Sequence, residues 1–311
     1  MDLLKISGMT LLVSVCVVSA AAQGSGPTTP SVEERSDLVS LRKRAEQGDA
    51  KASYLLGRSY LTGSGVRQDY QEAAKWCRQA ATQNLADAQF LLGFLYEHGD
   101  GVARDYRTAL SYYTSAARQG HVTAQNNLAM LNELGRGTKR NIPEAERWYR
   151  AAAEQSMVPA QCNLASLEFR QKNYQQALIW FRSAAQHGNV SAQEDLAWMY
   201  YTGTGVPLDY LEAAKWVQLA AKHGFARAQL DLGFLYERGK GVPLDYVSAY
   251  AWYMAAEDGG QKQAGTQLKS LSLLMTREQI SAAREKAASV PRSPSGMDET
   301  EGSIGRPFGG F

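Results

Sequence analysis

The strongest constraint on the fold of this chain is a segment that recurs at intervals of 36 residues, with one interval of 32. Residues 203–216 read GTGVPLDYLEAAKW, residues 239–252 read GKGVPLDYVSAYAW, and residues 63–76 read GSGVRQDYQEAAKW. Repetition at this interval is typical of solenoids, in which each unit packs only against its neighbours. A repeat array grows by stacking, so the length of 311 residues does not require two ordinary domains. We expect one continuous array.

Six copies of the repeat align over residues 48–260, at about 48–83, 84–119, 120–155, 156–187, 188–223 and 224–260. Three columns recur: an alanine, a leucine followed by Gly or Ala, and an aromatic residue. A large apolar residue beside a small one suits close helix packing, so each repeat is predicted to be two packed helices, A and B, with the aromatic column in the core. The alanines are Ala73, Ala109, Ala145, Ala177, Ala213 and Ala249; the leucines are Leu56, Leu92, Leu128, Leu164, Leu196 and Leu232; the aromatic residues are Trp76, Tyr112, Trp148, Trp180, Trp216 and Trp252.

Turn and capping residues predict where the helices begin and end. A Gly-x-Gly turn follows helix A in every repeat except the fourth, and glycine adopts positive φ without steric cost. Asp or Asn then stands where helix B begins, as an N-cap. In four repeats Glu or Gln follows three residues later, which predicts a capping box. The caps are Asp69, Asp105, Asn141, Asn173, Asp209 and Asp245, and the box partners are Glu72, Glu144, Gln176 and Glu212.

The two ends of the chain differ in composition from the array. Lys5 precedes an apolar run that ends at Ala22, which predicts a signal peptide over residues 1–22, cleaved after Ala22. An uncleaved membrane anchor is the alternative, but the run is shorter than the roughly 20 residues that span a bilayer. We expect a periplasmic or secreted protein without stable membrane insertion after signal removal. A linker (23–30), an N-terminal cap helix (31–47) that begins with a Ser31–Glu34 capping box, C-terminal capping helices (261–290) and a disordered tail (291–311) complete the prediction.

Charge and reactive side chains indicate no cofactor, metal or nucleic acid. The formal net charge is +2, which gives no broad basic field. Cys77 and Cys162 lie in different repeats and are expected to be buried thiols. His187 and His223 share a column at the end of helix B, where they are expected to cap the helix. His98 and His121 have no partners at metal-ligand spacing.

The pattern Ala-x-x-x-Leu-Gly-x-x-Tyr-x-x-Gly-x-Gly-Val-x-x-Asp-Tyr-x-x-Ala-x-x-Trp-x-x-x-Ala-Ala resembles the Sel1-like repeat family, a relative of the tetratricopeptide repeats. The fourth copy, without the glycine turn, is closer to a plain tetratricopeptide repeat. The resemblance implies an all-α, right-handed α/α superhelical solenoid that acts as an adaptor for protein partners, often in bacterial envelopes.

By analogy with tetratricopeptide repeats, the residues two before and two after each column leucine are expected to face a concave groove. The groove would be apolar with a charged edge, which suits a protein interface. The alternative is that Phe94 and Trp198 only pack against the neighbouring helix A. The predicted partner-binding residues are Tyr54, Arg58, Phe90, Phe94, Glu97, His98, Asn126, Met130, Glu194, Trp198, Leu230, Phe234 and Arg238.

These observations favour an exported, non-catalytic adaptor that binds a protein or peptide of unknown identity. One alternative is an envelope hydrolase of the β-lactamase type, which has been suggested for cysteine-rich Sel1-like proteins. This chain lacks a cysteine pair in every repeat, and its one Ser-x-x-Lys motif (Ser40 to Lys43) lies in the expected cap helix. A second alternative is a secreted effector that binds a host protein.

Overall fold

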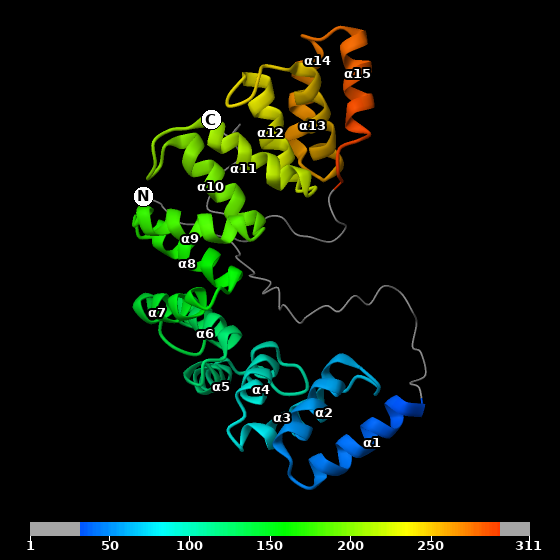
Figure 1. The fold of residues 1–311 in the computed structure, drawn as a ribbon, viewed down its shortest axis with the longest axis vertical. Helices are drawn as coiled ribbons and strands as arrows, with labels where there is room; N and C mark the ends of the chain where they lie inside the picture. Colours follow the sequence, from blue (N-terminus) through cyan, green and yellow to red (C-terminus); the bar gives the residue numbers. More distant parts are fainter. Residues whose placement is uncertain (1–31, 293–311) are drawn as a thin grey trace, which may run out of the picture. The chain divides into compact units, whose positions relative to one another are not determined.

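The structure is a computed structural model that describes residues 32–292, with side chains from residue 38 onwards. The described part contains fifteen α-helices and no strand (Figure 1). None of these helices has both the length and the apolar character needed to span a membrane. The helices are α1 (Val32–Glu46), α2 (Ala50–Thr62), α3 (Tyr70–Ala81), α4 (Ala86–His98), α5 (Tyr106–Arg118), α6 (Val122–Leu134), α7 (Ile142–Glu154), α8 (Val158–Arg170), α9 (Tyr174–Gln186), α10 (Val190–Thr202), α11 (Tyr210–Lys222), α12 (Ala226–Arg238), α13 (Tyr246–Asp258), α14 (Lys262–Ser272) and α15 (Arg277–Ala287).

The helices alternate as predicted, with helix A of the six repeats in α2 to α12 (even numbers) and helix B in α3 to α13 (odd numbers). Among the described residues, 32–160 form one compact unit and 161–292 form another. The first unit contains α1 to α7, in which each helix packs against the next; the second contains α9 to α15, and α8 begins at the boundary. The fold is therefore an all-α array of helix pairs.

Side-chain caps begin most of the B helices, as the sequence predicts. In α11, for example, Asp209 accepts hydrogen bonds from the backbone amides of Leu211 and Glu212, both at 3.0 Å. Asp69, Asp105, Asn141 and Asp245 cap α3, α5, α7 and α13 in the same way. Asn173 differs: its side chain makes no cap bond to α9 and instead donates to the Glu168 carboxylate at 2.8 Å.

Two of the glutamates predicted to complete a capping box have another role. The Trp76 indole donates to Glu72 at 3.0 Å, and the Trp148 indole donates to Glu144 at 2.7 Å. A residue and the fourth residue after it lie on one helix face, so this pairing satisfies the indole N–H within its own helix. A complete capping box is found at α15, where Thr276 and Gln279 bond to each other's backbone amides.

The two glycines of each turn are required for different reasons. The first ends helix A in the left-handed conformation; Gly99, for example, has φ +80° and its amide bonds to the carbonyl of Leu95. The second packs against the start of helix B in the preceding repeat, except in the first repeat, where Gly65 packs against Leu38 of α1. A Cβ built on Gly101 (φ +67°) would lie 2.2 Å from the carbonyl oxygen of Tyr70. Only glycine fits there, so the turn is a packing element between repeats.

The predicted leucine and alanine columns form the core. Every leucine of the column is at most 2% exposed and every column alanine is fully buried. The prediction for the aromatic column needs correction: Trp76 and Trp148 are buried, but Tyr112, Trp180, Trp216 and Trp252 are only half-buried. The next residue along the helix occupies the deepest position because it points at the small column of helix A. These deeply buried residues are Cys77, Tyr113, Tyr149, Phe181, Val217 and Tyr253.

Additional helices cover both ends of the described array. Leu38 and Leu41 of α1 pack on a buried cluster that includes Leu56 and Trp76. At the other end α14 and α15 both pack on α13, and Lys286 of α15 donates to Ser248 at 2.5 Å. The predicted signal peptide, the linker, Ser31 and tail residues 293–311 lie outside the described residues. Pro291, the first residue of the predicted tail, accepts a hydrogen bond from Gln229 at 2.7 Å.

Candidate functional site

The surface predicted to bind a partner lies on the A helices, and the structure divides its residues into buried and exposed groups. A buried side chain offers no surface to a partner in this conformation. The buried residues are Glu97, Asn126, Met130, Glu194, Leu230 and Phe234, all at most 9% exposed. The half-buried or exposed residues are Tyr54, Arg58, Phe90, Phe94, His98, Trp198 and Arg238.

Glu97 is part of the interior and not of a groove edge. Its carboxylate accepts a hydrogen bond from the Tyr113 hydroxyl at 2.7 Å, and the Asn127 amide donates to the same hydroxyl at 3.3 Å. Burial, and then the nearby Glu97, raise the pKa of Tyr113 well above its usual value. The hydroxyl therefore stays protonated and can donate to the carboxylate.

The same pairing of a B-helix tyrosine with an A-helix glutamate recurs in two other repeats. Tyr149 donates to Glu133 at 2.9 Å, and Tyr253 donates to Glu237. In each pair the glutamate lies sixteen residues before the tyrosine. Where the tyrosine is replaced, by Cys77 or Val217, the glutamate is also absent. The glutamate and the tyrosine thus occur together in the same repeats. This co-occurrence is the signal in the sequence that could have indicated an interior role for Glu97.

In the second unit, packing covers the predicted apolar residues. Phe234 lies edge-on to Tyr253, with ring centroids 5.5 Å apart, and the Arg238 guanidinium lies 5.6 Å from the Phe234 ring. Leu230 is fully buried. Trp198 is half-buried and meets Phe169 edge-on at 5.8 Å. The exposed part of the predicted surface in this unit is thus limited to Trp198 and Arg238.

The first unit keeps a larger exposed group, which we call the α2–α4 face: Tyr54, Arg58, Phe90, Phe94 and His98. The two helices that carry it contact each other. The Arg58 guanidinium lies 5.8 Å from the Tyr54 ring, and the Phe94 and His98 rings lie 4.1 Å apart. Tyr54 and Phe94 also pack against the buried cluster of this unit. One side of these rings therefore supports the core while the other remains partly exposed.

His121 is a further residue of this region whose role the sequence did not indicate. Its ring stacks on Phe90 with centroids 4.5 Å apart, and its Nδ1 accepts from the Ala124 amide at 3.1 Å as the N-cap of α6. Its Nε2 lies 3.7 Å from Asp87. Burial lowers the pKa of His121 from 6.5, against the opposing effect of Asp87. The neutral ring is the form that can both accept at Nδ1 and stack.

The remaining candidates for chemistry have structural roles. His187 and His223 end their helices as predicted, and His187 Nδ1 lies 2.8 Å from the carbonyl of Ser183. Cys77 and Cys162 are free, buried thiols, as predicted. Burial raises the pKa of Cys77 to about 12 and also raises that of Cys162. Within residues 32–292 no group of three or more His, Cys, Asp or Glu side chains is placed to hold a metal ion.

Capped helix pairs stacked through leucine, alanine and glycine columns define an α/α repeat scaffold. The model of the Sel1 repeat matches six consecutive segments, residues 50–85, 86–121, 122–157, 158–189, 190–225 and 226–260. The chain belongs to the Sel1 repeat family. This fold is generally a non-catalytic scaffold and typically mediates protein interactions.

Two solved structures agree with this assignment. The chain is 35% identical to a protective antigen present in uropathogenic Escherichia coli strains that displays an SLR fold, with a TM-score of 0.73 over 81% of this chain. The match spans 56% of that protein's length. A Sel1 repeat protein from Oxalobacter formigenes is 31% identical, with a TM-score of 0.63 over 78% of this chain and 99% of its own. No curated protein matches the chain.

Proposed function

We propose that this protein is an exported, non-catalytic adaptor that holds a segment of a partner protein on the α2–α4 face. The observation that carries the proposal is the group of partly exposed rings, Tyr54, Phe90 and Phe94, beside the exposed Arg58 and His98. Aromatic residues and arginine dominate the binding energy of protein interfaces. Tyr54 and Phe94 pack against the buried cluster and Phe90 packs against Tyr113 and His121, so little conformational freedom would be lost on binding.

Export rests on the N-terminal sequence, Lys5 followed by the apolar run to Ala22. We expect the mature protein to begin at Gln23, in the periplasm or outside the cell. Cell fractionation, followed by mass determination of the purified chain, checks this expectation. A full-length chain recovered from the cytoplasm contradicts it.

The adaptor role is tested by affinity capture from an envelope extract with the mature chain as bait. The test variant is Arg58→Ala with Phe94→Ala, and the matched control is Arg118→Ala with Ile179→Ala, which removes an exposed arginine and an exposed apolar side chain elsewhere. Thermal unfolding verifies that both variants fold. We expect a protein captured by the wild type and the control to be lost with the test variant. Equal capture by all three places the binding surface elsewhere.

A non-catalytic role is tested separately. We expect no covalent adduct by mass spectrometry after incubation of the mature chain with benzylpenicillin. An adduct would support the hydrolase alternative.

A further inference from the structure

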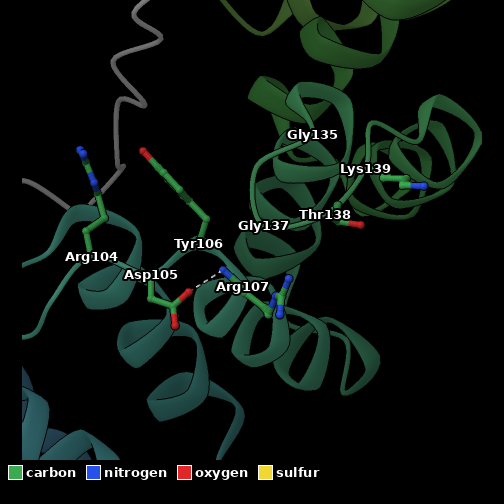
Figure 2. A pocket seen from close by; sticks show the side chains of 8 residues that line it. All are labelled: Arg104, Asp105, Tyr106, Arg107, Gly135, Gly137, Thr138 and Lys139. Atoms are coloured by element: carbon green, nitrogen blue, oxygen red, sulfur yellow. Dashed lines mark hydrogen bonds between the residues drawn. The ribbon is translucent and has the colours of Figure 1, made fainter.

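A cleft of about 550 Å³ lies where the turn of the third repeat meets the start of α5, and cations line it (Figure 2). Its lining, which we call the repeat 2–3 cleft, comes from Arg104, Asp105, Tyr106, Arg107, Gly135, Gly137, Thr138 and Lys139. All of these residues belong to the first compact unit. In Figure 2, Arg104 and Tyr106 extend to one side of the α5 start, while Arg107 extends away from Arg104.

Two backbone segments that line the cleft approach each other closely. Gly137 has φ +72°, and a Cβ built there would lie 2.3 Å from the carbonyl oxygen of Tyr106. Two guanidinium groups lie near the Tyr106 ring: that of Arg104 is 5.7 Å and that of Arg136 is 5.5 Å from the ring centroid. Two cations thus share one ring, and a third and fourth, Arg107 and Lys139, line the same space.

The four cations lack ion-pair partners within the described part of the chain. Neither Arg104, Arg107, Arg136 nor Lys139 forms an ion pair there. The one carboxylate in the lining, Asp105, is already engaged as the N-cap of α5. It accepts from the amides of Arg107 (2.9 Å) and Thr108 (3.2 Å) and from the Thr108 hydroxyl (2.6 Å). These bonds, together with the positive charge of the nearby Arg107, lower the pKa of Asp105.

The other repeats provide an internal comparison. The same junction between repeats occurs there with different residues at the positions equivalent to Arg104, Arg107, Arg136 and Lys139, in that order. The first and second repeats have Gln68, Gln71, Asp100 and Ala103 there; the fourth and fifth have Lys172, Gln175, Thr204 and Pro207; the fifth and sixth have Leu208, Leu211, Lys240 and Pro243. None of these junctions has more than one cation. The solenoid fold therefore does not require the four cations. The repeat 2–3 cleft has more cations than the equivalent positions of the other compared junctions.

We propose that the repeat 2–3 cleft binds an acidic segment, rich in Asp and Glu, of a partner protein. Clusters of arginine recognise acidic motifs because the guanidinium group pairs with a carboxylate through two parallel hydrogen bonds. The cleft volume accommodates several side chains. Nucleic acid fits less well, because its backbone requires a basic surface that continues beyond one junction. The inference goes beyond the proposed adaptor function: the cleft is a different surface from the α2–α4 face, and each can bind or fail independently.

The test measures fluorescence anisotropy of a labelled decapeptide of alternating Glu and Gly with the mature chain. The cleft variant is Arg104→Leu, Arg107→Leu, Lys139→Pro, which introduces the residues found at these positions in the fifth and sixth repeats. The matched control, Lys51→Gln, Arg67→Gln, Arg118→Gln, removes three exposed cations of the same unit away from the cleft. If the cleft variant unfolds at a lower temperature than the wild type, the single variants Arg104→Gln and Lys139→Gln replace it.

We expect the acidic peptide to bind, the cleft variant to weaken binding at least about tenfold, and the control to change it less than about threefold. An equal loss in the control shows a general charge effect and overturns the proposal, as does unchanged binding by the cleft variant or no binding at all. Tighter, cleft-dependent binding of oligothymidylate than of the peptide also overturns it, in favour of nucleic acid. The Arg58→Ala, Phe94→Ala variant should bind the peptide with wild-type affinity. Peptide binding at the cleft is thereby tested independently of partner binding at the α2–α4 face.

Discussion

At the scale of single residues, the interior of the second and sixth repeats depends on matching a glycine in helix A with a tyrosine ring in helix B. A Cβ built on Gly93 would lie 2.8 Å from the Tyr113 ring, and one on Gly233 would lie 2.4 Å from the Tyr253 ring. The ring fills the space that glycine leaves. Its hydroxyl then needs a buried partner, which Glu97 provides for Tyr113.

Tyr113→Phe is therefore expected to destabilise the protein by about 1–3 kcal/mol, because the buried Glu97 carboxylate loses its hydroxyl donor. The neighbouring Tyr112 is half-buried, and Tyr112→Phe should change stability by less than about 0.5 kcal/mol. Urea unfolding of both variants measures the difference. Equal stabilities would mean that the hydroxyl of Tyr113 contributes nothing to the fold.

At the scale of elements, the turn between helix A and helix B also joins consecutive repeats. Gly101 touches the backbone of Tyr70 and Gly137 that of Tyr106, so the second glycine of a turn rests on the preceding helix B. Buried glutamines form a second junction: Gln125 donates to the carbonyl of Ala117 at 3.3 Å, and Gln193 to that of Ala185 at 3.1 Å. The glycines pack against a neighbouring backbone and the glutamines donate hydrogen bonds to backbone carbonyls. Both kinds of position therefore tolerate little substitution.

Gly101→Ala should destabilise the protein more than Gly120→Ala, although both glycines have positive φ. At Gly120 no atom lies within 4 Å of the added Cβ, so the cost is backbone strain of about 1 kcal/mol. At Gly101 the Cβ must also displace the Tyr70 backbone, which adds at least another 1 kcal/mol or so. Thermal unfolding of the two variants checks the order, and a lower Tm for Gly120→Ala would contradict it.

At the scale of the whole molecule, buried titratable groups define a pH window of stability. Burial raises the pKa of Cys77 from 9.0 to about 12 and also raises the pKa values of Tyr113 and Tyr253, whereas it lowers that of His121 from 6.5. A raised pKa means that the unfolded chain loses its proton first as pH rises, so stability falls above about pH 9. A lowered histidine pKa means that the unfolded chain gains its proton first, so stability falls below about pH 6.5.

We therefore expect the free energy of unfolding to be greatest between about pH 6.5 and pH 9, as measured by urea titrations on both sides of this window. His121→Asn should flatten the fall just below pH 6.5, because asparagine caps the equivalent helix in the fifth repeat (Asn189) and does not titrate. A variant that keeps the wild-type slope there would show that another group controls it. The slope above pH 9 is the internal control and should not change.

Much of the fold could be predicted because the six copies of the repeat show the same capping, turn and core positions several times. The leucine and alanine columns, the Asp and Asn caps and the glycine turns all depend on residues close in the chain, and the structure has them where the sequence indicates, except that Asn173 makes no cap bond. The aromatic column was expected in the core, but the most deeply buried position belongs to the next residue along helix B. Periodicity separates the two faces of a helix but does not decide which of two adjacent residues points at the glycine of the partner helix.

The sequence by itself thus determined the all-α repeat architecture, the family and the boundaries of the helices, since these follow from short-range spacing. Only the tertiary structure decided which of the predicted groove residues are exposed. Glu97 turned inward because Tyr113, on another helix, needs an acceptor, and Phe234 was covered by Tyr253. The repeat 2–3 cleft also required the tertiary structure, because its cations come from the start of helix B in the second repeat and from the turn of the third repeat, which meet only when consecutive repeats stack.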